Sequence, residues 1–238
     1  MVVVAVAVGV LGFHVGSASH RPAQASPTTI PPPAAPDAGA AANAIALQLT
    51  VQPQDLSSQW VSVQSANYPL TVANAPSACL SGIPVGNRSA GALSQYSRDL
   101  QANGLESGDL TSTAFLQASD HDAAITRTRV ESPGYDACLQ AEVVSDLDNE
   151  GATSVAVAAV SSLPTPAGFA GVAERLSLTF MSGHTADTGI ADNVDFVQGR
   201  VEFRMVIFQC SCAPLDAGLE SSLVQTVSSR IQASSFGH

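Results

Sequence analysis

Four cysteines, Cys79, Cys138, Cys210 and Cys212, are the residues of this chain with the most direct chemistry. The last two lie one residue apart, near the end of the segment GRVEFRMVIFQCSCAPL (199–215). A metal site would need further closely spaced Cys or His ligands, and Cys79 and Cys138 are isolated in the sequence. A redox-active pair is more usually Cys-x-x-Cys beside a helix start. The pattern therefore favours structural disulfides over a metal or redox site.

Four cysteines allow three disulfide connectivities. We favour Cys79–Cys138, because this bridge would fix an irregular Asn-, Pro- and Gly-rich region onto a helix. Cys210 would then pair with Cys212. Residues i and i+2 of a regular strand lie about 6.6 Å apart, at the limit for a disulfide. A bend before Pro214 would close that gap.

Arg200 and Arg204 are the candidate ligand-binding residues. Both are expected on the long strand within 199–212, on the face opposite its main apolar residues. If that face lines a cleft, the two guanidinium groups could hold an anionic ligand bidentately. The alternative is that they pair with Glu202 or Glu174 on an exposed face of the sheet.

Two fragments resemble parts of known catalytic or metal-binding motifs. DLDNEG (146–151) matches the first half of a calcium loop, but position 12 is Val157 instead of a glutamate, which favours a solvated acidic turn. GNRSAG (86–91) misses the nucleophile elbow by one residue, and the sequence gives Ser89 no evident partner. No phosphate- or dinucleotide-binding glycine motif is present. The sequence thus predicts a protein without enzymatic activity, cofactor or metal.

The N-terminus predicts export. Residues 2–13 are apolar, and small residues with two small-x-small cleavage sites follow. This length suits the core of a signal peptide better than a full membrane span. No Lys or Arg precedes the apolar run, so an uncleaved anchor remains the alternative. We therefore expect residues 1–18 to be a signal peptide or membrane anchor, and the protein to be secreted or held at the cell membrane.

Residues 19–42 are rich in Pro and Ala and contain almost no large apolar residues, so they predict an extended linker. Residues 43–238 are expected to form a single extracytoplasmic domain. The chain has a net charge of −11 and nine basic residues, all arginine. It lacks the basic stripe that nucleic acids require, and an anionic membrane surface would repel it. Membrane contact is expected only through an uncleaved N-terminal segment.

The expected domain is α+β. Three segments alternate apolar and polar residues with a period of two, around 155–159, 176–180 and 201–207, which predicts an antiparallel meander. Residues 108–119 form a further strand candidate, residues 194–197 a short strand, and residues 45–51 also alternate. Residues 66–92 are expected to be irregular. Helices are predicted over 121–131, capped by Asp120, and behind Ser132-Pro133. A last amphipathic helix should begin at Pro214 and pack on the sheet through an apolar stripe, Leu215, Leu219, Leu223, Val224, Val227 and Ile231.

The chain resembles actinobacterial secreted sensor-like domains, typified by the extracellular sensor domain of mycobacterial receptor Ser/Thr kinases of the kinase H type. DLSSQW (55–60), Cys79, DACLQ (136–140) and QGRVEFRMVIF (198–208) carry this resemblance, over residues 45–235. It implies a helix-flanked antiparallel sheet with a central cleft and a bridge matching Cys79–Cys138. The second bridge of the kinase domain has no counterpart here, and no kinase domain is present. The resemblance supplies no ligand.

We therefore expect an exported, non-enzymatic, sensor-like domain of the cell envelope that binds a small molecule or envelope component of unknown identity. The alternative is a structural or protein-interaction module of the envelope. A hydrolase is the weakest interpretation, because it depends only on the incomplete fragments above.

Overall fold

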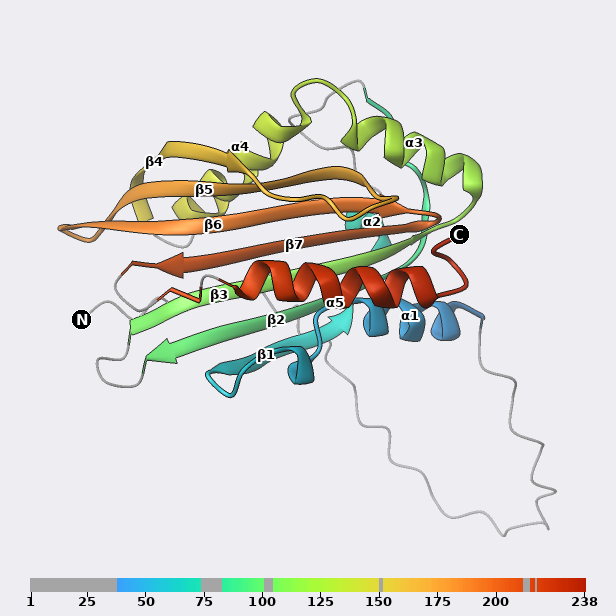
Figure 1. Ribbon diagram of the computed structural model, residues 1–238, viewed down its shortest axis with the longest axis horizontal. Helices are drawn as coiled ribbons and strands as arrows, with labels where there is room; N and C mark the ends of the chain where they lie inside the picture. The colour runs from blue at the N-terminus through green and yellow to red at the C-terminus, as the bar shows by residue number, and fades with distance from the viewer. Residues whose placement is uncertain (1–37, 74–82, 101–104, 150–151, 212–214, 217) are drawn as a thin grey trace, which may run out of the picture.

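A computed structural model describes residues 38–73, 83–100, 105–149, 152–211, 215–216 and 218–238 (Figure 1). Its helices are α1 (Ala38–Leu49), the 3-10 turn η1 (Pro53–Asp55), α2 (Leu70–Ala73), α3 (Asp120–Val130), α4 (Tyr135–Asn149) and α5 (Leu219–Ala233). Its strands are β1 (Trp60–Asn67), β2 (Arg88–Leu100), β3 (Leu105–Gln117), β4 (Ala152–Ser162), β5 (Ala170–Ser182), β6 (Thr185–Gln198) and β7 (Val201–Cys210).

The seven strands form one antiparallel sheet in the order β1-β2-β3-β7-β6-β5-β4. Two meanders meet at the β3–β7 pair, and α3 and α4 carry the chain from β3 to the far edge at β4 (Figure 1). A helix-covered antiparallel sheet is an α+β architecture. The predicted fold class is therefore confirmed, including the C-terminal helix on the sheet.

The face of the sheet under α1 and α5 holds the largest apolar cluster. Phe203, Met205 and Ile207 of β7 point into it, as their alternation predicts, and each is at most 1% exposed. From α5, Leu223 and Ile231 pack against the same cluster. Full burial of side chains of this size contributes about 1.5–3 kcal/mol each, so this face supplies much of the stability of the fold.

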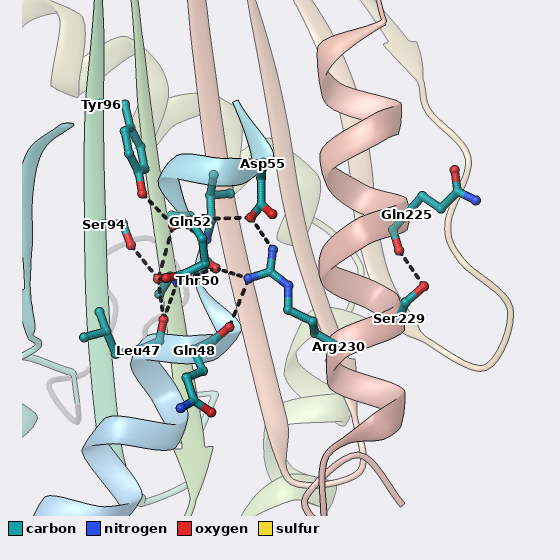
Figure 2. Close-up of polar contacts among 12 residues, drawn as sticks. Leu47, Gln48, Thr50, Gln52, Asp55, Ser94, Tyr96, Gln225, Ser229 and Arg230 are labelled. Atoms are coloured by element: carbon teal, nitrogen blue, oxygen red, sulfur yellow. Dashed lines mark hydrogen bonds and ion pairs between the residues drawn. The ribbon is translucent and has the colours of Figure 1, made fainter. Parts of the chain in front are cut away.

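A polar clasp joins α5 to the end of α1 at the border of that cluster (Figure 2). The guanidinium group of Arg230 donates to the carbonyl oxygens of Gln48 and Thr50, at 3.0 and 2.9 Å, and forms an ion pair with Asp55. Beside it, the hydroxyl group of Tyr96 on β2 donates to the carbonyl oxygen of Val51 at 2.8 Å. The clasp satisfies carbonyl groups at the C-terminal end of α1 that the helix itself leaves unpaired.

The opposite face of the sheet lies under α3 and α4 (Figure 1). Tyr135 and Leu139, in the first turns of α4, pack with Val197 near the end of β6. Val143 and Leu147 pack with Leu176 farther along β5. The sequence predicts a helical face of Tyr135, Cys138, Leu139 and Val143 behind Ser132-Pro133, and this is confirmed, since all four residues are buried. Between the two apolar clusters, the sheet presents charged side chains.

Several expectations for the N-terminal half are wrong. Residues 45–51 alternate like a strand, yet α1 covers Ala38–Leu49 and begins inside the expected linker. Alanine is the strongest helix former, and Ala42, Ala46 and Leu49 also fall on one helical face. Residues 1–37 lie outside the described residues, so the leader and most of the linker remain predictions. The expected irregular region ends earlier than predicted, because β2 begins at Arg88.

Other boundaries shift by a few residues. Ser119, not Asp120, caps α3, and its hydroxyl oxygen accepts from the backbone N–H of Asp122. The strand expected at 194–197 is the end of β6, which has 14 residues and continues a hairpin with β5. The terminal helix begins at Leu219, so Leu215 precedes it and is 42% exposed. Pro214 lies outside the described residues.

Candidate functional site

A buried ion triad lies on the α3/α4 face where β2, α3 and β7 meet. Nε and Nη2 of Arg88 donate to Oε2 of Glu202 at 3.0 and 2.7 Å, and Nη2 of Arg129 donates to Oε1 at 2.5 Å. Gln117 adds a bond to Oε2 at 3.1 Å. Glu202 has no exposed surface. Its burial alone would raise the pKa of the carboxyl group, but the charges of Arg88 and Arg129 outweigh burial and hold the pKa below its ordinary value.

Aromatic rings support both arginines of this Glu202 triad. The guanidinium carbon of Arg88 lies 4.3 Å from the centre of the Phe115 ring, and that of Arg129 lies 5.6 Å from the Tyr135 ring. Such cation–π contacts hold a guanidinium group in one orientation. The triad therefore pairs each buried charge with an opposite charge, as buried charges require, and the aromatic rings help to fix its geometry.

A second carboxylate, Asp195 on β6, is completely buried one strand away. Its Oδ2 accepts from the hydroxyl group of Tyr135 and from Nε of Arg204, the latter at 3.0 Å. Burial raises the pKa of Asp195 to about 6, and the nearby charge of Arg204 only partly opposes this. Asp195 is thus a carboxyl group whose charge changes near neutral pH.

Arg204 connects this buried carboxylate to the surface. Its Nη2 donates to Oε2 of Glu142 on α4 at 2.7 Å. The Arg204 and Glu142 side chains are 33% and 41% exposed. The Arg204–Glu142 pair is therefore the solvent-facing border of an otherwise buried polar region.

Polar side chains continue from this border beneath α4. Asn193 is adjacent to Asp195 on the same face of β6 and lies opposite Glu174 of β5. The Glu174 carboxylate accepts from Nε2 of Gln140 on α4 at 2.9 Å. We call the following set the α4 layer: Tyr135, Gln140, Glu142, Glu174, Asn193, Asp195 and Arg204.

Three atoms of the α4 layer have no hydrogen-bond partner among the residues that the structure describes. They are Oε1 of Glu174, Nδ2 of Asn193 and Oδ1 of Asp195, on side chains at most 4% exposed. Leaving a buried polar atom unpaired costs about 1–3 kcal/mol, so proteins seldom keep several together. The layer combines fixed, paired charges with free hydrogen-bonding capacity, which is characteristic of a ligand site.

The two arginines singled out from the sequence are not brought together. Arg204 belongs to the α4 layer, whereas Arg200 precedes β7 and lies in the β6–β7 turn, which corrects its placement on the strand. The Arg200 guanidinium group donates to the carbonyl oxygens of Gln117 and Ala118, at 2.6–3.1 Å, and lies over the ring of Phe236. Arg200 therefore holds the C-terminal segment around Phe236 against the end of β3.

The alternative prediction, that the two arginines pair with Glu202 or Glu174 on an exposed face of the sheet, is also only partly right. Arg204 pairs with Asp195 and Glu142, not with Glu202 or Glu174. Glu202 is buried instead of lying on an exposed sheet face. The guanidinium groups of Arg200 and Arg204, which were expected to hold an anion, thus already contact oxygen atoms of the protein.

Cys138 and Cys210 are both disulfide-bonded. The two cysteines are not bonded to each other, because they lie near opposite ends of β7. Leu139, the neighbour of Cys138 in the chain, packs beside Val197 of β6, and Val197 lies opposite Glu202 near the start of β7. Glu202 and Cys210 are eight residues apart on β7, or about 26 Å, whereas bridged Cα atoms lie within about 7 Å. Cys79 and Cys212 lie outside the described residues, so Cys79–Cys138 and Cys210–Cys212 remain predictions.

The motif fragments do not form sites. Asp146 and Asp148 lie within α4 instead of a calcium loop, and Glu150 and Gly151 lie outside the described residues. Ser89 is on β2, where its hydroxyl group donates to the carbonyl oxygen of Leu116. In the described ranges, no cluster of three or more His, Cys, Asp or Glu side chains suited to a metal ion is found.

Sequence reasoning missed Arg88, Arg129, Asp195 and the buried role of Glu202. A signal is visible in hindsight: Asp195 and Glu202 each interrupt a run of apolar residues on strands that are covered on both sides. A charge at such a position must be paired. The two arginine partners of Glu202 lie 73 and 114 positions away in the chain, and Tyr135 lies 60 positions from Asp195, so spacing alone does not reveal them.

Among the described helices, none combines the length and the apolar character needed to cross a bilayer. Comparison with protein-family models and with curated proteins gave no match to this chain.

Proposed function

We propose that this chain is an exported, non-enzymatic, sensor-like domain of the cell envelope that binds its ligand at the α4 layer. The observation that carries the proposal is the group of three buried, unpartnered polar atoms next to the partly exposed Arg204–Glu142 pair. Ligand sites carry a few convergent polar groups, and the α4 layer offers such groups beside a partly exposed border.

Two further observations support the location and the class. Disulfides at Cys138 and Cys210 are typical of oxidising compartments outside the cytoplasm. The helix-covered antiparallel sheet is the architecture that the resemblance to kinase sensor domains implies. The membership of that family is itself part of the proposal.

Binding of cell-envelope lipids and wall fragments to the purified domain tests the proposal. The variant is Arg204→Ala, which removes one ion-pair partner of Asp195 and one of Glu142. The matched control is Arg230→Ala, a similarly exposed arginine on the opposite face. We expect at least one ligand whose affinity changes about tenfold in Arg204→Ala and is unchanged in Arg230→Ala. Indifference of all three proteins to the whole panel would contradict a binding function.

A protein-interaction module is the second candidate, and the sheet edges favour it. Val61 and Val63 on β1 and Val160 on β4 are 49–64% exposed, and neither edge strand contains a charged residue. Uncharged edges are templates for strand pairing, although bulges interrupt both strands here. Cross-linking in native envelope followed by mass spectrometry separates the candidates: cross-links concentrated on β1 or β4 favour this one.

A further inference from the structure

We propose that the ligand of the α4 layer is a small organic cation, held through an ammonium group by Glu174, Asn193 and Asp195. This inference rests on the proposed function and names its ligand class. It differs from the anionic ligand that the sequence suggests, because the structure gives both candidate arginines other partners.

Two of the three unpartnered atoms are acceptors and require a hydrogen-bond donor. Oε1 of Glu174 and Oδ1 of Asp195 are acceptors without a hydrogen bond. The third atom, Nδ2 of Asn193, exchanges places with the side-chain oxygen when the amide turns by 180°. The site can therefore present three oxygen acceptors, and a primary ammonium group has three N–H donors.

The register of the strands brings these side chains together. Glu174 and Asn193 are directly opposite each other on β5 and β6, so their Cβ atoms are about 4.5–5.5 Å apart. Asp195 follows Asn193 on the same face, about 6.6 Å along the strand. At these spacings, one ammonium group placed between the three side chains would be within hydrogen-bond reach of all of them.

The charge of this face also favours a cation. Three arginines face six carboxylates there: Arg88, Arg129 and Arg204 against Asp136, Glu142, Asp146, Glu174, Asp195 and Glu202. The Glu202 triad uses two of the arginines, and Arg204 is shared between Asp195 and Glu142. Glu174 has only the neutral amide of Gln140 as a partner. The chain as a whole carries −11, which attracts cations to the surface.

Burial raises the pKa of both Glu174 and Asp195, because each charged carboxylate is separated from water. A bound ammonium group favours the charged forms. Binding at pH 6 should therefore release protons, and affinity should fall as the pH is lowered from 7.5 to 5.5.

Three four-carbon probes test the ligand class by calorimetry of the whole domain: putrescine, 1,4-butanediol and succinate. We expect saturable binding of putrescine only, weakened about tenfold to a hundredfold in Glu174→Gln. The matched control is Glu220→Gln, the same change at a buried carboxylate under α5. Its affinity for putrescine should equal that of the unaltered protein. Asn193→Asp should bind putrescine several-fold more tightly.

The outcomes separate the two proposals. Binding of butanediol or succinate but not of putrescine would overturn the ligand class and leave a binding function standing. Putrescine binding that Glu174→Gln and Glu220→Gln weaken equally, or not at all, would reveal general attraction to an acidic protein and overturn the site. Absence of saturable binding by these probes and by the envelope panel would overturn both proposals.

Discussion

The two faces of the sheet are stabilised in different ways. Under α1 and α5, strand and helix side chains form one large apolar cluster, and the Arg230 clasp lies at its border (Figure 2). Under α3 and α4, the apolar clusters are smaller, and the Glu202 triad and the α4 layer lie between them. Charges cost free energy to bury and can be replaced by apolar residues without loss of stability. The α5 face also buries charged groups, in the Arg175–Asp192 ion pair and at Glu220 of α5, but the α3/α4 face holds the larger buried network. That network indicates that the α3/α4 face is shaped for more than stability.

The largest effect is expected from breaking the Glu202 triad. Glu202→Gln removes the buried carboxylate that both Arg88 and Arg129 contact, which should destabilise the protein by about 3–5 kcal/mol in urea unfolding. The triple variant Arg88→Met, Arg129→Met, Glu202→Leu removes all three charges and should lose less. A cost below about 1 kcal/mol for Glu202→Gln would show that the triad is more hydrated than its burial indicates.

Shortening one apolar side chain under α1 and α5 tests the same comparison between the two faces of the sheet. Leu223→Ala on α5 should destabilise by about 2–5 kcal/mol, because Leu223 is fully buried and a cavity would remain. The loss should be the same at pH 5.5 and pH 7.5. A loss that depended strongly on pH would show that a titrating group of this face, such as Glu220 with its burial-raised pKa, is coupled to Leu223.

Stability should rise when the pH falls from 7.5 toward 5. The pKa of Asp195 is about 6 in the folded protein against 3.8 ordinarily, so the folded state binds this proton more tightly than the unfolded state. The gain grows as the pH falls through 6, ends near pH 4, and is on the order of 3 kcal/mol.

The burial-raised pKa of Glu174 adds to this gain, whereas the lowered pKa of Glu202 removes stability at more acidic pH. Urea midpoints measured across this range should therefore pass through a maximum at mildly acidic pH. Asp195→Asn should flatten the rise, because an amide does not titrate there. An unchanged rise in that variant would assign the effect to other groups.

Loss of the clasp should have a smaller effect. Arg230→Ala removes two hydrogen bonds to carbonyl oxygens and the ion pair with Asp55 at a partly exposed position. We expect a loss of about 1–2 kcal/mol in thermal or urea unfolding, with α1 exchanging its amide hydrogens faster. Equal exchange in α1 with and without Arg230 would show that the apolar cluster alone holds the helix.

The smallest effect is expected at the border of the α4 layer. Glu142→Gln removes an ion pair whose two side chains are about one third or more exposed, so stability should change by less than about 1 kcal/mol. Ligand affinity should change more than stability does. The reverse result, a large loss of stability with unaltered binding, would assign the pair a structural role.

Much of the fold could be predicted, because the C-terminal strands and α4 show clear periodicity. Val201 to Ile207 alternate, and the buried residues of α4 recur at helical spacing. α1 could not, since Ile45, Leu47 and Leu49 alternate like a strand while Ala42, Ala46 and Leu49 recur at helical spacing, and tertiary packing decided between the two periods. The site was largely missed for a different reason. Arg88, Arg129 and Glu202 come from three elements, and only the strand order places them together.

The most direct test of the account follows backbone amide chemical shifts while the purified, disulfide-intact domain is titrated with its tightest envelope ligand. We expect saturable changes at Glu174, Asn193 and Asp195, with the amides of Leu223 and Val227 on α5 unaffected. Changes confined to the α5 face or to the edge strands would contradict the central claim that the charged face of the sheet is the binding face.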